Sequence, residues 1–495
     1  MKKLNFFLDK VFFKKILSIT LLFFIFILFI FGFRAYSGNK LIYLLFTIIS
    51  TCSLFYGFRK KSIFFDNFIA ILLWLGFWFK FTIQISFLNS QFPEGTGLFD
   101  FKPGSYDQVL LISSVGLVSF SLASFIRNFF FNYDKINFAN FYLSGIGNFL
   151  NKKKKNFLYL FIFIILLFAF LNFHFSFYQK GVIPKVDMPF GISNIFNWLL
   201  FFGFATFFSI LIFIFYLGNF RHKKNIIYLA LLECFISSVS QLSRAMIFNG
   251  GSIIFGLHQT LVKAGIKIRK SDIFKLCLIL SLLFILSLYV VSKLRQAKDF
   301  PIGHQVHSYL PTLSSSSENT SNAVNMSNDV IKELNQVLFL VSGRWVGIEG
   351  MMTILSNPEK SFLFFKRSFN EKFNYSNSFY ENAVKKNVHS YKRNPPLFTV
   401  YVPGMIGYLY YTGSVFFLVT SIIFVCFVCS YLEFFALKAS KNNLIFCSLI
   451  GNILAYRVAH FGYMPINTYK ILTAIILTIF LVFFVMKLLQ NIKKR

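Results

Sequence analysis

Charged side chains stand inside or beside apolar stretches of this sequence, where they are costly. Arg344 and Glu349 lie within the mostly apolar segment QVLFLVSGRWVGIEGMMTIL (336–355), and Arg244 lies between two apolar stretches in SSVSQLSRAMIFNGG. In membrane proteins such residues are seldom retained without a partner or a task. Arginine suits phosphate because its planar donors bind two oxygens together. We interpret Arg244 and Arg344 as candidate ligands of an anionic headgroup. The alternative for Arg244 is an interfacial arginine that extends toward water.

A third arginine is followed by a histidine that could accept a proton. Arg457 and His460 in ILAYRVAHFGYMP are three residues apart and therefore share a helical face. Histidine has an ordinary pKa of about 6.5, and a nearby arginine favours its neutral form. Glu349, with an ordinary pKa of about 4.3, would need desolvation to act as a base, and it could instead pair with Arg344. We expect His460 to be the base, although packing of Arg457 and His460 against loops would explain both equally well.

Other residues with metal-binding or redox potential carry weaker patterns. His304 and His307 form an HxxH without an adjacent carboxylate, and Cys426 and Cys429 form a CxxC inside the apolar run VTSIIFVCFVCSYL. Three acids precede the fourth predicted helix and could bind metal, act as a base or be solvated: Glu94, Asp100 and Asp107. We predict no metal site, no cofactor and no disulfide. Walker, dinucleotide, HExxH and GxSxG motifs are absent, so ATP-driven transport and hydrolysis have no support.

The composition indicates the setting in which these residues must work. The chain has 495 residues, of which 56% are hydrophobic, and its mean hydropathy is +0.63. These values exclude an ordinary soluble domain and favour a helical membrane protein with many spans. The net charge of +32 does not indicate nucleic-acid binding, because Lys and Arg gather in short runs between apolar blocks.

Apolar stretches of about twenty residues predict twelve membrane-spanning helices. They cover 16–33, 41–58, 63–88, 108–130, 157–178, 194–217, 226–242, 245–262, 273–292, 398–436, 444–461 and 468–488, and the stretch 398–436 is long enough to be broken. We therefore predict an all-α polytopic protein in three parts. Residues 1–292 carry helices one to nine, 293–397 form one large loop with short helices, and 398–495 carry helices ten to twelve.

Every alternate connection between these helices is rich in Lys and Arg. The positive-inside rule places those connections and both termini in the cytoplasm, and the large loop outside it. If 336–355 alone crossed the bilayer, the basic C-terminus would be moved outside, so we expect a re-entrant or interfacial helix. The alternative is fourteen spans, with 336–355 and 398–411 both crossing.

The layout resembles the Wzy-type O-antigen polymerases, which join oligosaccharide repeat units. About twelve spans, a dominant outer loop before the last helices and arginines at outer helix ends are similar to that family. Two stretches add to the resemblance, LSRAMIF (242–248) and PPLFTVYVPGMIGYLYYTGS (395–414).

The resemblance implies inverting glycosyl transfer at the periplasmic face of a bacterial inner membrane, without metal or nucleotide sugar. The donor would be a glycan on undecaprenyl diphosphate, and the product an O-antigen or capsule-type polysaccharide. Arg244, Arg344 and Arg457 would bind the diphosphate, and His460 or Glu349 would activate the acceptor hydroxyl. Membrane lipids and a chain-length regulator would be partners, and nucleic acid would not.

Two alternatives remain open. The related O-antigen ligases have a similar layout but transfer the glycan to lipid A core. A polysaccharide flippase or transporter would need internal repeats and polar residues near the bilayer midplane. The sequence has no clear repeat, and its polar residues concentrate at the predicted outer face, which favours an enzyme.

Overall fold

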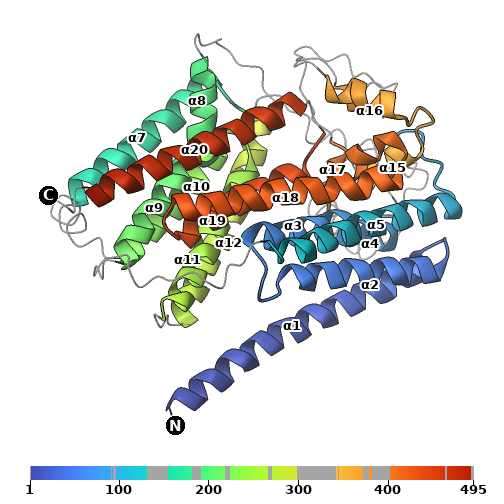
Figure 1. Ribbon diagram of the computed structural model, residues 1–495, viewed down its shortest axis with the longest axis horizontal. Helices are drawn as coiled ribbons and strands as arrows, with labels where there is room; N and C mark the ends of the chain where they lie inside the picture. Colours follow the sequence, from blue (N-terminus) through green and yellow to red (C-terminus); the bar gives the residue numbers. More distant parts are fainter. Residues whose placement is uncertain are drawn as a thin grey trace, which may run out of the picture.

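Figure 1 shows a computed structural model of the chain, a bundle of long helices that run side by side. It describes residues 2–90, 92, 96–130, 154–180, 191–217, 223–265, 270–297, 342–343, 345–371, 378–381, 402–462 and 465–491. All regular structure in these ranges is helical.

The described helices fall into three groups along the chain. The first is α1 (Lys2–Ala35), α2 (Lys40–Gly57), α3 (Phe64–Trp74), the π-helical turn η1 (Leu75–Phe79), α4 (Lys80–Phe87) and α5 (Pro103–Arg127). The second is α7 (Lys154–Phe175), α8 (Ile192–Trp198), the π-helical turn η3 (Leu199–Gly203), α9 (Phe204–Leu217), α10 (Lys223–Ser240), the 3₁₀ turn η4 (Arg244–Met246), α11 (Ile247–Lys263) and α12 (Lys270–Ala297). The third is α15 (Ile348–Leu355), α16 (Phe362–Phe369), α17 (Gly404–Leu409), the 3₁₀ turn η6 (Tyr410–Thr412), α18 (Val415–Ala439), α19 (Leu444–Ala459) and α20 (Pro465–Asn491).

Nine helical stretches among the described residues are long and apolar enough to cross a membrane. They are Ser18–Ala35, Lys40–Gly57, Phe64–Phe87, Pro103–Arg127, Leu158–Phe175, Ile192–Phe215, Ser271–Arg295, Val415–Ala439 and Thr468–Leu488. The prediction of an all-helical polytopic membrane protein is thereby confirmed. The predicted spans at 226–242, 245–262 and 444–461 form the helices α10, α11 and α19, which are not among the nine.

The predicted stretch 398–436 is broken, as its length indicated. The turn η6 ends at Gly413, whose φ of 71° lies in the left-handed region that favours glycine. A new helix, α18, then begins under the hydroxyl of Ser414, which accepts a hydrogen bond from the Phe417 amide at 3.3 Å.

The predicted re-entrant segment 336–355 is described from residue 342 onward, with residue 344 excepted. Its helix α15 has eight residues, which is about 12 Å of rise at 1.5 Å per residue. The hydrocarbon core of a bilayer is about 30 Å thick, so α15 by itself does not span.

Helix α19 is the centre of the packing. It lies against α3, α9, α11 and α18, and most of its residues are buried. Helix α11 approaches closely because Gly256 has no side chain: a β-carbon there would lie 2.7 Å from the Ile445 Cα. Helix α19, which carries Arg457 in its last turn and is followed by His460, is therefore fixed by helices on several sides.

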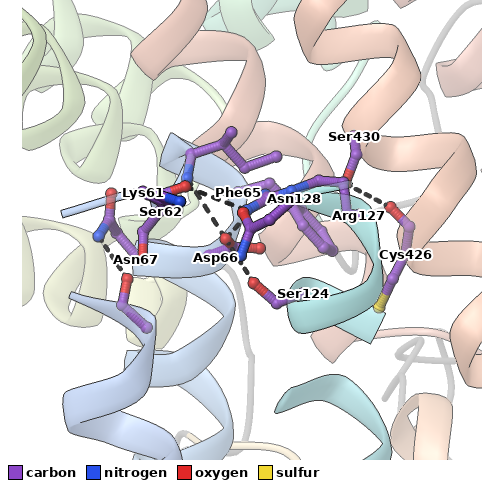
Figure 2. A network of polar contacts seen from close by, with 12 residues as sticks. Lys61, Ser62, Phe65, Asp66, Asn67, Ser124, Arg127, Asn128, Cys426 and Ser430 are labelled. Atoms are coloured by element: carbon purple, nitrogen blue, oxygen red, sulfur yellow. Dashed lines mark hydrogen bonds and ion pairs between the residues drawn. The ribbon is translucent and has the colours of Figure 1, made fainter. Parts of the chain in front are cut away.

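A buried polar network joins the start of α3 to the end of α5. In Figure 2, Asp66, Ser124 and Arg127 point toward one another. Arg127 Nη1 lies 2.7 Å from Asp66 Oδ2, and the Ser124 hydroxyl donates to the same oxygen at 2.7 Å. From α18, the Glu433 carboxylate accepts hydrogen bonds from the amides of Phe64 and Phe65 at 2.9 and 2.7 Å. A carboxylate at a helix N-terminus is favourable, so this network ties three helices together.

Candidate functional site: a cationic cluster at the end of α19

The site begins with two residues that the sequence analysis singled out. Arg457 lies in the last turn of α19, and its guanidinium carbon is 5.1 Å from the centre of the Phe201 ring. Its Nε is buried and has no hydrogen-bond partner among the described residues. A buried donor without a partner is unusual and is consistent with a site for a bound acceptor.

His460 follows α19 directly and is held in one orientation. Its ring stacks on Tyr456 with 4.1 Å between the ring centres, and Nδ1 lies 3.1 Å from the Tyr456 carbonyl oxygen. Since a carbonyl only accepts, the neutral ring carries its proton on Nδ1 and keeps a lone pair on Nε2. Burial, followed by the positive charges of Lys180, Arg457 and Lys80, lowers the pKa of His460 to about 3. The imidazole is therefore neutral at ordinary pH.

Lys180 brings a second cation to Arg457. It comes from the connection after α7, and its backbone amide donates to the Gln241 carbonyl at 3.0 Å. Its Nζ lies 5.6 Å from the centre of the Tyr456 ring and 6.0 Å from that of Phe201. Burial and then the charges of Arg457 and Arg295 lower the pKa of Lys180 to about 7. A lysine so placed gains a favourable partner when an anion binds.

Arg295, in the last turn of α12, supplies a third cation. Its Nε and Nη2 donate to the Leu242 carbonyl at 3.1 and 2.7 Å. Leu242 has a φ of 51°, which turns the chain sharply between α10 and η4. Arg244 begins η4 two residues later, so its backbone lies at the same turn. The side-chain amide of Gln241, just before this turn, is buried, and neither its nitrogen nor its oxygen has a hydrogen-bond partner among the described residues.

Glu349 lies in a separate buried ion pair. Its Oε2 is 2.6 Å from Lys80 Nζ, and the two side chains are 1% and 0% exposed. Lys80 also donates to the Trp345 carbonyl oxygen at 2.9 Å. Sequence reasoning did not consider Lys80 as a partner of Glu349, and the suggested pairing of Glu349 with Arg344 stays a prediction. Arg344 itself lies outside the described residues.

Two π-helical turns border this region. One of them, η1, ends immediately before Lys80, and the other, η3, contains Phe201, whose carbonyl oxygen accepts a hydrogen bond from the Asn249 amide at 2.7 Å. Such turns are rare and occur frequently at functional sites, since they rotate the residues that follow.

The candidate metal and redox residues have structural surroundings where they are described. Asp107 accepts hydrogen bonds from the Tyr36 hydroxyl at 2.7 Å and the Asn39 amide at 2.9 Å, and Asp100 is paired with Lys102 at the surface. Cys426 and Cys429 are buried in α18, and both thiols are free. No group of three potential metal ligands occurs in the described part of the chain. Glu94, His304 and His307 lie outside it.

Comparison with known proteins adds no relative. No protein-family model, no curated protein and no solved structure matches the chain.

Sequence reasoning found two of the five residues that carry this site. It singled out Arg457 and His460, which the structure brings together, but it passed over Lys180, Arg295 and Lys80. A signal for Lys80 was present: it is the only lysine or arginine inside the predicted helix 63–88, and a charge within an apolar segment is the feature that drew attention to Arg344 and Glu349. Lys180 and Arg295 carried no such signal, since each lies near a helix end in the sequence.

Proposed function

We propose that the protein is a membrane glycosyltransferase that polymerises oligosaccharide repeat units carried on undecaprenyl diphosphate. One observation carries the proposal. Lys180 and Arg457 lie close to a neutral histidine and to Arg295 at one end of the bundle, and burial, followed by the neighbouring positive charges, lowers the pKa values of Lys180 and His460, an arrangement that favours the binding of an anion. A lipid diphosphate would supply that anion, and the surrounding apolar helices would accommodate its tail.

The cations would act mainly on the leaving group. As the bond between the sugar C1 and the phosphate oxygen breaks, the diphosphate gathers negative charge. Fixed positive charges stabilise that state more than the bound donor, which accelerates the transfer. Arginine binds two phosphate oxygens at once, and Lys180 would take up a proton as the anion arrives.

His460 would activate the acceptor. Its Nε2 lone pair takes the proton of an acceptor hydroxyl while the hydroxyl oxygen attacks C1 from the face opposite the phosphate, which inverts the configuration. A group with a pKa near 3 is a poor base. The charge of a bound diphosphate opposes that of Lys180 and Arg457, so donor binding would raise the pKa of His460 and ready it for the acceptor.

The proposal places this end of the bundle at the periplasmic face of a bacterial inner membrane. In Figure 1 α1 begins and α20 ends on the left, whereas α15, α16 and α17 lie on the right. This arrangement supports cytoplasmic termini with the outer segments at the opposite end. Arg244 and Arg344 remain proposed diphosphate ligands beside Arg457.

The test is reconstitution of the purified protein in vesicles with undecaprenyl-diphosphate-linked repeat units. We expect a ladder of lengthened lipid-linked glycans, which is lost in Arg457→Ala. Transfer to lipid A core without a ladder would instead identify a ligase. Movement of unaltered donor across the bilayer with no new bond would identify a flippase, and either result would overturn the polymerase assignment.

A further inference from the structure

The helix formed by α3, η1 and α4 holds one segment of the chain along a single face. Gly76, Lys80 and Gln84 are spaced four residues apart, so they lie above one another. Gln84 Nε2 donates to the Ser342 hydroxyl at 3.0 Å, and Lys80 bonds to the Trp345 carbonyl and the Glu349 carboxylate. One turn before Lys80, a β-carbon on Gly76 would lie 2.0 Å from the Val346 carbonyl oxygen. The backbone of this helix therefore touches the backbone of the segment at Gly76, which has no side chain.

The same segment reaches the end of α19. Gly404, at the start of α17, lies between them: a β-carbon there would be 3.2 Å from the Ala459 carbonyl oxygen and 3.2 Å from Val346 Cγ1. Ala459 is the residue before His460. On its other side the segment touches α11, since the ring centres of Trp345 and Phe248 are 6.2 Å apart. The segment 342–349, described except for residue 344, therefore lies close to the helix end that carries the cationic cluster, with Gly404 between them.

Stability alone gives a poor account of Lys80. Burying two charges costs several kcal/mol per ion, and apolar replacements of a buried pair are often neutral or stabilising. Such a pair inside an apolar bundle is more readily explained by a task, and fixing the position of a chain segment is one that a charge pair performs well.

We propose that Lys80 is a positioning residue of the transfer reaction: it fixes the segment 342–349 beside the cationic cluster through the Glu349 carboxylate and the Trp345 carbonyl. This inference rests on the proposed function for its catalytic consequence, but the fixing itself is measurable without any substrate. Lys80 touches neither donor nor acceptor in this scheme. It acts through the segment that it holds.

The first arm of the test measures access to the segment. Thr353 is buried in α15 and its hydroxyl donates to the Glu349 carbonyl at 2.8 Å, so Thr353→Cys in a background without the native cysteines reports opening of α15. Lys80→Met should raise the rate of labelling by a water-soluble maleimide on the order of 10²-fold, since the buried Glu349 carboxylate loses its ion pair with Lys80 and the open segment becomes more favourable. Gln84→Met, which removes one neutral hydrogen bond, should raise it about fivefold.

A matched control is the exposed pair of Lys102 and Asp100, whose charged atoms are 3.4 Å apart with side chains 76% and 42% exposed. Lys102→Met should leave the labelling rate unchanged, because exposed pairs contribute little. If Lys80→Met and Gln84→Met both label like Lys102→Met, the segment is not held by this helix face and the proposal is wrong. If Lys80→Met does not fold, Gln84→Met alone decides the same question.

The second arm measures the reaction in vesicles. Lys80→Met should lower kcat by about 10²-fold and weaken donor binding much less, because Lys180 and Arg457 still bind the diphosphate when the segment that carries the proposed ligand Arg344 is no longer fixed. Equal loss in donor binding and kcat would overturn the positioning role. If the native protein itself makes no polymer, the proposed function fails, and the labelling arm still reports whether Lys80 fixes the segment.

Discussion

Lys180 carries a charge that the unliganded protein does not favour, because burial and the charges of Arg457 and Arg295 lower its pKa from 10.5 to about 7. Between these values the unfolded chain binds the lysine proton and the folded chain does not, so the free energy of unfolding rises with pH from about 7 to 10.5. Such a residue costs stability and is retained for what it binds.

Replacing this lysine should therefore stabilise the folded protein and weaken its binding of the lipid diphosphate. We expect Lys180→Met to raise Tm in detergent by about 2–4 °C at pH 7 or below, with the difference vanishing near pH 10. Binding of an undecaprenyl diphosphate lipid should weaken about tenfold or more. Lys102→Met serves as the control for removing a lysine charge from the surface. A lower Tm for Lys180→Met at pH 7 would contradict the assignment of Lys180 to an anion site.

His460 predicts a stability change of the same sign in a lower pH window. Its ordinary pKa of 6.5 falls to about 3 in the folded chain, so the unfolded imidazole alone takes up a proton between these values. The native protein should lose stability as the pH falls from 6.5 toward 3, and His460→Gln should show a flatter profile. Turnover of His460→Gln should fall on the order of 10²–10⁴-fold with donor binding nearly intact. If the native protein and His460→Gln show the same dependence of stability on pH and the same turnover, Glu349 is the better candidate for the base.

The site residues that could be predicted from the sequence are charged or titratable residues that lie within or at the end of an apolar stretch. Arg457 and His460 stand out because a span ends beside them, and the fold then places them together. Lys180 and Arg295 are distant from α19 in the sequence. Both are hydrogen-bonded to the turn at Gln241 and Leu242, and no spacing rule indicates the left-handed backbone of Leu242. Hydropathy found the helices because every span must be apolar, but the pairing of their ends depends on packing between helices.

At the scale of elements, the network of Asp66 and Arg127 fixes the end of the bundle away from the cationic cluster. Asp66 and Lys80 are fourteen residues apart on one nearly continuous helix, about 21 Å at 1.5 Å per residue. Arg127→Met removes the ion pair at 2.7 Å and leaves a buried carboxylate in the network drawn in Figure 2. We expect a loss of about 3–5 kcal/mol in the free energy of unfolding.

This loss should not extend to the site. Donor affinity measured on the folded fraction of Arg127→Met should equal that of the native protein, because distant, independent sites behave additively. Asp100→Asn, which changes an exposed acid, is the control and should alter neither quantity. If Arg127→Met retained the full free energy of unfolding, the network would not stabilise the packing of α3 against α5.

The whole molecule must place its two ends on opposite sides of a membrane for the proposed chemistry to work. Lipid-facing side chains fit a bundle in a bilayer: Phe23 on α1, Phe163 on α7 and Ile285 on α12 are 62%, 62% and 61% exposed. Apolar surface of this extent is costly in water and favourable in lipid.

Sidedness follows from the basic connections and has a direct test. Lys60 lies in the basic connection after α2, and Lys102 lies before α5 in a connection that we predict to be external; both are exposed. In intact cells, a membrane-impermeant thiol reagent should label Lys102→Cys at once and Lys60→Cys only after permeabilisation, since the positive-inside rule places Lys60 in the cytoplasm. Each variant is made without the native cysteines and checked for folding by its Tm. The reverse pattern would put the cationic cluster on the cytoplasmic side, where no periplasmic donor could reach it, and the proposed function would fall with the topology.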